Sequence, residues 1–404
     1  MSEPIRILFV DDDPNVLNGL RRAIANGAED WHTEFCAEAK DALIRMDDRP
    51  FDVIVTDMRM PSVDGAQLLE QVRVRHPSTI RIILSGYADP GTVLRTIGPA
   101  HAYLAKPCNS KEIADAIARP LELRRLMAND GMLRAVGQLV NLPSMPSLYL
   151  EIESLLRSPS ASVKAVADII SQDIAMTAEV LKLTNSAFFS VGAKITTPLQ
   201  AVRILGLETI QTLVLSTGIF RQFLDGGSAP PSMIRALTRH GTETARLAEA
   251  IALAEGADGT TGKAASCAGM LSCLGPLVLL DSQPDRYRAL LARVDADHPL
   301  DQLEQGVFGA DHALIGAYLL GLWGFSESMV EAVARSCRPR LIGPSENLLL
   351  TALHAARALS PPLPGLADGE RDVPSLDEAY LDQCGRNGSV GRWQALASSS
   401  VPPE

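Results

Sequence analysis

Residues 51–65, Phe-Asp-Val-Ile-Val-Thr-Asp-Met-Arg-Met-Pro-Ser-Val-Asp-Gly, decide the fold of the first part of the chain. Residues 51–56 have the short apolar pattern of a buried strand, which ends in front of Asp57. Similar runs cover residues 5–10, 80–84 and 102–105, and stretches of helical period, such as 16–25 and 39–46, lie between the runs. Strands and helices that alternate at this length predict parallel βαβ units, and therefore a doubly wound α/β sheet.

Polar residues follow the ends of these predicted strands. Asp11 and Asp12 follow the strand predicted at 5–10, Asp57 follows the one at 51–56, Ser85 the one at 80–84, and Lys106 the one at 102–105. Ligands of such sheets bind beyond the carboxyl ends of the strands, and carboxylates that converge there repel one another unless a cation such as Mg²⁺ lies among them. A carboxylate can attack a phosphoryl group, and a metal ion, a lysine and a hydroxyl can stabilise the transferring charge. An Asp cluster alone is usually a turn or a helix cap, but this joint order predicts an acidic phosphorylation pocket.

Residues 5–120 resemble a receiver domain of the chemotaxis-regulator type, which has a flavodoxin-like fold. The matching stretches are Val10-Asp11-Asp12-Asp13, Asp57-Met58-Arg59-Met60-Pro61 with Asp64-Gly65, Leu84-Ser85-Gly86, and Tyr103-Leu104-Ala105-Lys106-Pro107. None of these positions departs from the family pattern. The resemblance therefore implies an active receiver that a sensor histidine kinase phosphorylates.

The resemblance also assigns roles around the acidic pocket. Asp57 would be the phospho-acceptor. Asp12, Asp57 and the backbone carbonyl of Arg59 would hold Mg²⁺, and Asp11 would act on the ion through water. Mg²⁺ is thus the one cofactor that the sequence predicts.

Three further residues are expected to respond to phosphorylation. By the resemblance, Ser85 would bind a phosphate oxygen, Lys106 would pair with the phosphoryl group, and Tyr103 stands at the position of the aromatic switch residue. Phosphorylation adds a charge of roughly −1.5 to −2 and three acceptor oxygens. Movement of Ser85 and Lys106 toward them would leave space for Tyr103 and reshape that face of the domain.

A helical connector is expected to follow the receiver. Residues 111–139 carry apolar side chains at a spacing of three and four, Pro120 should kink the helix, and Asp130-Gly131 should interrupt it. No Gly/Ser spacer is present, so the link is semi-rigid. It fits either a helix paired between two protomers of a homodimer or a lever within one chain. We assign residues 1–121 to the receiver and 122–137 to the connector.

Beyond Leu139 the strand patterns disappear, and an all-α domain of about ten helices is expected over residues 138–360. The predicted helices cover residues 147–157, 162–172, 174–185, 198–205, 208–223, 232–255, 263–280, 311–322 and 345–359. A C-terminal extension, 361–404, begins with a loose Pro/Gly-rich stretch. Short docking helices are expected at 376–381 and 393–396, with disorder after Ala397.

The helical part resembles the HDOD family, a branch of the HD-domain superfamily. The matching stretches are Leu142-Pro143-Ser144-Met145-Pro146, Asn185-Ser186-Ala187-Phe188-Phe189, Ala201 to Leu207, Arg239-His240, Ala268-Gly269-Met270-Leu271, and Val307-Phe308-Gly309-Ala310-Asp311-His312 leading into Gly316. The overall expectation is a multidomain protein with an α/β receiver followed by an all-α HDOD domain.

The departures from the catalytic HD enzymes matter most. Those enzymes carry Leu-His-Asp-x-Gly-Lys in the central helix, whereas this chain has Leu271-Ser272-Cys273-Leu274-Gly275-Pro276. His240 and His312 remain at positions that resemble flanking ligands, and Ser336-Cys337 replaces a later His-rich stretch. This set falls short of a hydrolytic metal site, so no cofactor and no enzymatic activity are expected of the output domain. A zinc site of Cys273, His240 and His312 is the less favoured alternative to buried histidines with local hydrogen bonds.

Composition limits the remaining functions. A formal net charge of −11 argues against general nucleic-acid binding, and the six cysteines form no CxxC pair. The longest uncharged run, residues 264–280, is interrupted by Ser, Gly and Pro, so a buried helix is expected rather than a membrane span. The start of the chain lacks the apolar stretch of a signal peptide, and a cytoplasmic protein is expected.

Three functions are weighed on these grounds. The favoured one is a phosphorylation-controlled module that binds signalling proteins, which by family resemblance include enzymes of cyclic di-GMP signalling or other kinases. The first alternative is a receiver-controlled, metal-dependent phosphodiesterase, against which the Ser272-Cys273 replacement argues. The second is a nucleic-acid-binding regulator. Arg235, Arg239 and Arg246 are candidates for its basic surface, but they are few and have acidic neighbours.

Overall fold

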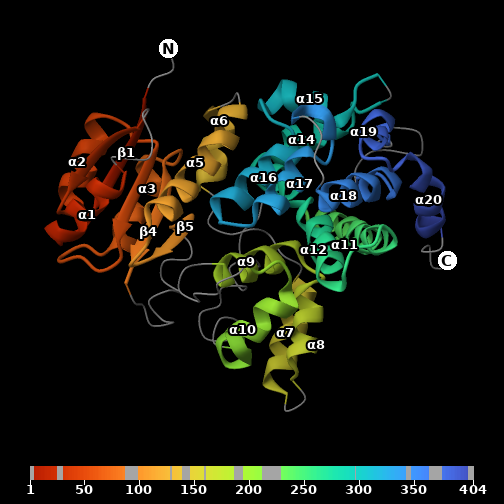
Figure 1. Ribbon diagram of the computed structural model, residues 1–404, viewed down its shortest axis with the longest axis horizontal. Coiled ribbons are helices and arrows are strands. Elements are labelled where there is room, and N and C mark those ends of the chain that lie inside the picture. Colours follow the sequence, from red (N-terminus) through yellow and green to blue (C-terminus); the bar gives the residue numbers. More distant parts are fainter. Residues whose placement is uncertain are drawn as a thin grey trace. The chain divides into compact units, whose positions relative to one another are not determined.

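The structure is a computed structural model whose chain divides into two compact units (Figure 1). It describes residues 4–24, 31–86, 99–127, 130–138, 146–158, 161–185, 194–211, 229–295, 297–342, 347–363 and 375–398. The first unit consists mainly of residues 1–140, and the second mainly of residues 141–404.

The first unit contains a five-stranded parallel sheet in the order β2-β1-β3-β4-β5. Its strands are β1 (Ile5–Val10), β2 (Trp31–Cys36), β3 (Val53–Asp57), β4 (Ile80–Ser85) and β5 (Ala102–Ala105). The predicted doubly wound α/β sheet is confirmed. The sequence ranges missed β2, because this strand is mostly half-buried and its sequence, Trp-His-Thr-Glu-Phe-Cys, lacks a continuous apolar run.

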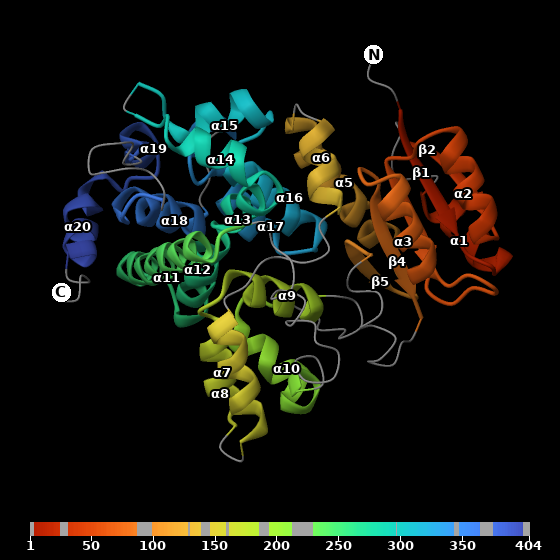
Figure 2. The same ribbon diagram turned by 180° about the vertical axis from the view of Figure 1, so that it is seen from behind.

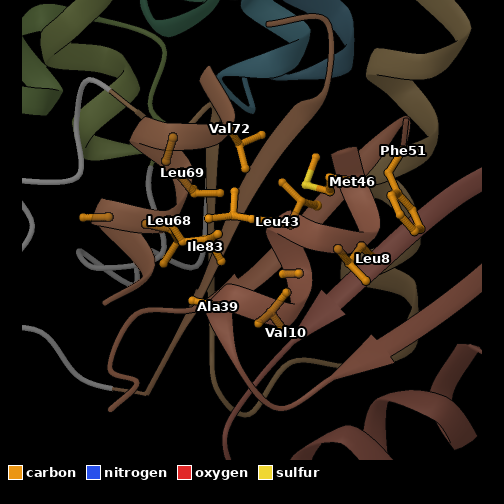
Figure 3. Packing of buried hydrophobic residues seen from close by; sticks show 14 of the residues in the cluster. Leu8, Val10, Ala39, Leu43, Met46, Phe51, Leu68, Leu69, Val72 and Ile83 are labelled. Atoms are coloured by element: carbon orange, nitrogen blue, oxygen red, sulfur yellow. The ribbon is translucent and has the colours of Figure 1, made fainter. Parts of the chain in front are cut away.

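The helices of this unit are α1 (Pro14–Ile24), α2 (Ala39–Asp48), α3 (Gly65–Arg75) and α5 (Ser110–Leu126). Two of them, α2 and α3, bury an apolar cluster against the sheet (Figure 3). Leu8 and Val10 of β1 pack with Leu43 and Met46 of α2, and Leu69 is among the residues that α3 contributes. Helix α2 contacts α3, whereas α1 contacts α5. The rigid sheet places the carboxyl ends of β1, β3 and β4 at one edge.

The connector predicted over residues 122–137 contains the end of one helix and most of the next. Helix α5 runs through Pro120 and ends before Met127, and α6 covers Asp130–Gln138. The predicted interruption therefore precedes Asp130, which begins the second helix. Helix α6 packs on the first unit: the Arg81 guanidinium, fully buried in β4, donates to the carbonyl oxygen of Gly137 at 2.8 Å.

The second unit is helical throughout its described residues, as predicted. Its helices are α7 (Pro146–Arg157), α8 (Val163–Ile170), α9 (Ile174–Thr184), α10 (Pro198–Gln211), α11 (Pro231–Ala254), α12 (Gly259–Leu271), α13 (Leu274–Ser282), α14 (Pro284–Leu291), α15 (Leu300–Phe308), α16 (His312–Leu322), α17 (Glu327–Arg335) and α18 (Leu348–Leu359). The helices predicted from the sequence did not include α14, α15 or α17. Most of the predicted helix 208–223 lies outside the described residues.

The apolar run at 264–280 lies in the core of this unit. Among the described residues, Gly259–Ser282 is the one segment long and apolar enough to cross a membrane, and 89% of its most apolar window is buried. The chain turns at Ser272 and Cys273, so the single helix expected over 263–280 is in fact two, α12 and α13. This segment is a buried core element, as expected.

The C-terminal extension packs against the helical unit (Figure 2). It contains α19 (Glu378–Gln383) and α20 (Val390–Ser398), and α20 contacts α11 and α18. Trp393 is fully buried, and its indole N–H donates to Oε1 of Glu255 at 3.0 Å. The two short docking helices are confirmed. The Pro/Gly-rich stretch lies largely outside the described residues. Of the end predicted to be disordered after Ala397, the structure describes Ser398 alone, which still belongs to α20.

Helices α13 and α16 approach so closely that Gly275→Ala should destabilise the protein strongly. A Cβ at Gly275 would lie 1.9 Å from the carbonyl oxygen of His312, and neither backbone can move without separating the helices. We expect the free energy of unfolding to fall by about 3 kcal/mol or more, measured by urea denaturation. Gly306→Ala in α15 is the matched control, because a Cβ there meets no atom within 4 Å. Equal stabilities of the two variants would contradict the prediction.

Candidate functional sites

The carboxyl edge of the sheet brings two predicted acids onto one lysine. Asp11 follows β1, Asp57 ends β3 and Lys106 follows β5. The Lys106 ammonium donates to Oδ2 of Asp11 at 2.5 Å and also to Oδ1 of Asp57. Asp11 and Asp57 are 2% and 8% exposed, so both carboxylates are shielded from water. The backbone N–H of Arg59 donates to Oδ2 of Asp57 at 2.6 Å, which fixes the orientation of that carboxylate.

Burial and charge act against each other in this pocket. Burial raises the pKa of Asp11 above its ordinary value, although the hydrogen bond from Lys106 opposes the shift. Burial lowers the pKa of Lys106, but its bonds to Asp11 and Asp57 raise that pKa by more, so the lysine remains a cation. Two carboxylates around one ammonium leave net negative charge at the edge of the sheet.

The oxygen donors of this pocket fit Mg²⁺. The carboxylates of Asp11 and Asp57 already converge on one cation, the Lys106 ammonium, and hard divalent cations prefer such oxygens. Asp12 is exposed, and within the described residues no three His, Cys, Asp or Glu side chains form a group that could hold an ion. Asp12 is therefore the predicted ligand that the structure does not bring to the other two carboxylates.

Ser85 and Tyr103 lie on the neighbouring strands. Ser85 ends β4, and its carbonyl oxygen accepts from the backbone N–H of Lys106 at 2.8 Å. Tyr103 pairs with Ile83 in the β4–β5 register and packs into the apolar cluster of α2 and α3. The lysine and the serine are thus joined through the backbone, and the predicted switch residue lies inside the domain.

A second candidate site is a cavity of about 450 Å³ within the helical unit. His240 of α11 and His312 of α16, the two histidines singled out in the sequence, both line it. Ser336 and Cys337, which follow α17, line it as well. The structure also adds residues that the sequence analysis missed, including His354 and Arg357 of α18.

Ser272 and Cys273 do not line this cavity. Both are almost fully buried at the turn between α12 and α13, where the Ser272 hydroxyl donates to the carbonyl oxygen of Gly269 at 2.8 Å. Burial raises the pKa of the Cys273 thiol to about 12, which keeps the sulfur protonated. The alternative zinc site of Cys273, His240 and His312 therefore gains no support from the geometry.

A buried glutamate organises one wall of the cavity. Glu304 of α15 is fully buried, accepts from the Tyr287 hydroxyl at 2.9 Å, and binds the backbone N–H of His312 at 2.8 Å and its Nδ1 at 2.5 Å. On the other side of the ring, Arg357 donates to Nε2 of His312 at 2.6 Å. Arg357, His312 and Glu304 thus form a continuous relay.

The relay fixes the tautomer of His312. Burial lowers the pKa of His312, whereas Glu304 and Cys337 raise it by more, to about 10. A guanidinium, however, has only N–H groups to offer, so Nε2 must accept from Arg357 in this arrangement. We therefore assign the neutral ring, with its proton on Nδ1 and donated to Glu304. A proton on Nε2 would require Arg357 to turn to another acceptor.

His240 has one unused ring nitrogen. Its Nδ1 is buried and has no hydrogen-bond partner among the described residues. Burial, together with the nearby Arg357 cation, lowers the pKa of His240 to about 4, although a backbone hydrogen bond to Pro361 opposes the shift. The ring is neutral near pH 7. Because its other nitrogen faces the Pro361 carbonyl, Nδ1 presents a lone pair.

Comparison with known proteins identifies both units. Residues 7–118 match the response regulator receiver domain, and residues 142–339 match the HDOD domain. Both matched ranges fall within the domain limits expected from the sequence. A receiver domain typically binds Mg²⁺ and implies a histidine kinase as its phosphodonor.

Curated relatives share only part of the chain. The hydrogenase transcriptional regulatory protein HoxA of Cupriavidus necator is 27% identical over 177 residues, which are 41% of this chain and 36% of that protein. An uncharacterized protein of Treponema pallidum is 28% identical over 198 residues, 48% of this chain and 37% of that protein. The chain therefore spans well under half the length of these relatives.

Among solved structures, the MmoQ response regulator of Methylococcus capsulatus matches the chain at 23% identity and a TM-score of 0.46. It aligns over 63% of this chain and 98% of that chain. Together with the parallel sheet and the helical second unit, the two domain matches show that the chain belongs to the receiver-domain response regulators and carries an HDOD output domain.

Proposed function

We propose that phosphorylation of Asp57 switches a non-catalytic HDOD domain that binds other signalling proteins. The observation that carries the proposal is the Lys106 ammonium held between the buried carboxylates of Asp11 and Asp57. A phosphoryl group on Asp57 changes the charge that the Lys106 ammonium faces, and Lys106 is joined to Ser85 by a backbone hydrogen bond.

Each residue of the pocket has a different role in phosphoryl transfer. Oδ1 of Asp57 attacks phosphorus, and the bond to the donor breaks. The Lys106 ammonium moves toward the negatively charged phosphoryl group and donates to one of its oxygens, while the Ser85 hydroxyl donates to another. Asp11, Asp12, Asp57 and the Arg59 carbonyl would hold Mg²⁺, which neutralises charge on the transferring group. Tyr103 would then move into the space that Ser85 leaves and so alter the β4–β5 face.

The geometry of the helical cavity supports a binding role for the output domain. Both ring nitrogens of His312 are engaged, one with Glu304 and the other with Arg357, so neither has a lone pair free for an ion. Ser272 and Cys273, which stand where HD enzymes have their metal-binding pair, lie outside the cavity lining. By family resemblance, the partners include enzymes of cyclic di-GMP signalling or other kinases.

The proposal is tested by capturing partners in two states of the receiver. Full-length protein is immobilised and exposed to host lysate with and without Mg²⁺ and beryllofluoride, which mimics a phosphorylated aspartate. A protein enriched only with the mimic, and lost with Asp57→Asn, would support a switchable adaptor. Equal recovery in both states would show that the receiver does not gate these contacts. Hydrolysis of cyclic di-GMP by the purified chain would favour the phosphodiesterase instead.

A further inference from the structure

Arg357 brings a buried positive charge to the helical cavity. Arg357 is 8% exposed, and within the described part of the chain it forms no ion pair with a carboxylate. Its one hydrogen bond there goes to Nε2 of His312 and uses a single N–H of five. The charge of Glu304 reaches it only through the His312 ring. A desolvated guanidinium with unused donors favours an anion beside it.

The other cations on the cavity wall are already paired. Arg338 binds Asp301 at 2.5 Å, and Arg340 binds Asp377 at 2.6 Å. These pairs leave Arg357 as the free positive charge among the described lining residues. Two residues that line the cavity therefore have unused hydrogen-bonding groups. Arg357 has N–H groups that lack an acceptor, and Nδ1 of His240 lacks a donor.

We propose that this cavity binds the phosphate group of a small phosphorylated molecule without a metal ion, with Arg357 on the anionic oxygens and His240 accepting from a hydroxyl of the ligand. A phosphate monoanion or a hydroxylated phosphate ester offers both acceptors and a donor, whereas a carboxylate offers acceptors alone. The volume of about 450 Å³ lies within the range of small-molecule sites. This inference goes beyond the adaptor role and does not depend on phosphorylation of Asp57.

Ligand binding would also change the hydrogen bond between Arg357 and Nε2 of His312. An anion that takes the N–H groups of Arg357 frees Nε2, which can then carry a proton and donate to the same anion. Glu304 remains on Nδ1 and balances the added charge. The relay therefore has a second arrangement in which Arg357 and His312 both face the ligand.

Cys337 supplies a site-specific readout in the unmodified chain. Its sulfur lies 3.6 Å from Nε2 of His312 on the cavity wall, whereas the similarly half-buried Cys384 lies outside the lining. Full-length protein is treated with iodoacetamide in EDTA, with inorganic phosphate, acetate or chloride at equal ionic strength, and each cysteine is followed by mass spectrometry. Phosphate should slow the alkylation of Cys337 and leave Cys384 unchanged. Unchanged alkylation of Cys337, equal protection by acetate, or protection that requires a divalent cation would overturn the proposal.

Calorimetry with variants supplies the second test. Arg357→Gln keeps a donor for His312 but removes the charge, so the phosphate affinity in EDTA should fall about tenfold to a hundredfold. Arg335→Gln is the matched control, because Arg335 is also a buried arginine but lies outside the cavity lining and pairs with Glu331. Circular dichroism checks folding of both. The proposal fails if wild type takes up no phosphate or if the two variants lose affinity equally, and neither result would bear on receiver switching.

Discussion

Asp57→Asn should abolish phosphoryl transfer to the chain from acetyl phosphate and Mg²⁺. The variant keeps the size of the side chain but lacks the carboxylate oxygen that attacks phosphorus. The fold should survive, because Lys106 retains its bond to Asp11 at 2.5 Å and one of the two buried like charges is removed. Intact-mass spectrometry of the full chain measures the outcome: one added phosphoryl group in wild type and none in the variant.

Two further substitutions separate the nucleophile from the groups around it. Lys106→Ala should still accept the phosphoryl group, but roughly a hundredfold to a thousandfold more slowly, because one preorganised donor is lost. Asp47→Asn should have no effect, since Asp47 is exposed and pairs with Arg75 and His76 on the receiver surface. Incorporation into Asp57→Asn at the wild-type rate would remove Asp57 from the mechanism.

The receiver pocket was predictable because its residues are placed by strand ends. A parallel sheet brings the carboxyl ends of its strands to one edge, so Asp11, Asp57, Ser85 and Lys106 could be grouped from their positions alone. Asp12 shows the limit of that argument: sequence position brings a residue to the edge, but the side chain of Asp12 lies exposed, apart from the two buried acids.

The helical cavity was predicted only in part. His240 and His312 were found through a family motif, and they do share the cavity. Glu304 and Arg357 belong to different helices, and no motif in the sequence links either of them to His240 or His312. Helix α15, which carries Glu304, was itself missed, and the run 263–280 was expected to be one helix although the chain turns at Ser272 and Cys273. Contacts between helices depend on packing, which periodicity does not encode.

Glu304→Ala should cost about 3–5 kcal/mol of stability, because the glutamate is the buried anion on which one wall of the cavity depends. Its removal leaves the Tyr287 hydroxyl and two N–H groups of His312 without an acceptor, and Arg357 without the charge that balances it through the ring. Urea denaturation of the full chain measures the loss. Gln302→Ala, at an exposed position of the same helix, should change stability by no more than about 0.5 kcal/mol.

The isosteric Glu304→Gln variant tests whether charge or shape is responsible. Glutamine can still accept one hydrogen bond, so the protein should remain folded, but the ring of His312 loses its anionic partner. Burial lowers the pKa of His312, and the Glu304 carboxylate is the strongest influence in the opposite direction. The pKa of His312, followed by NMR in full-length protein, should therefore fall in Glu304→Gln. An unchanged pKa of His312 would mean that a group other than Glu304 supplies the balancing charge.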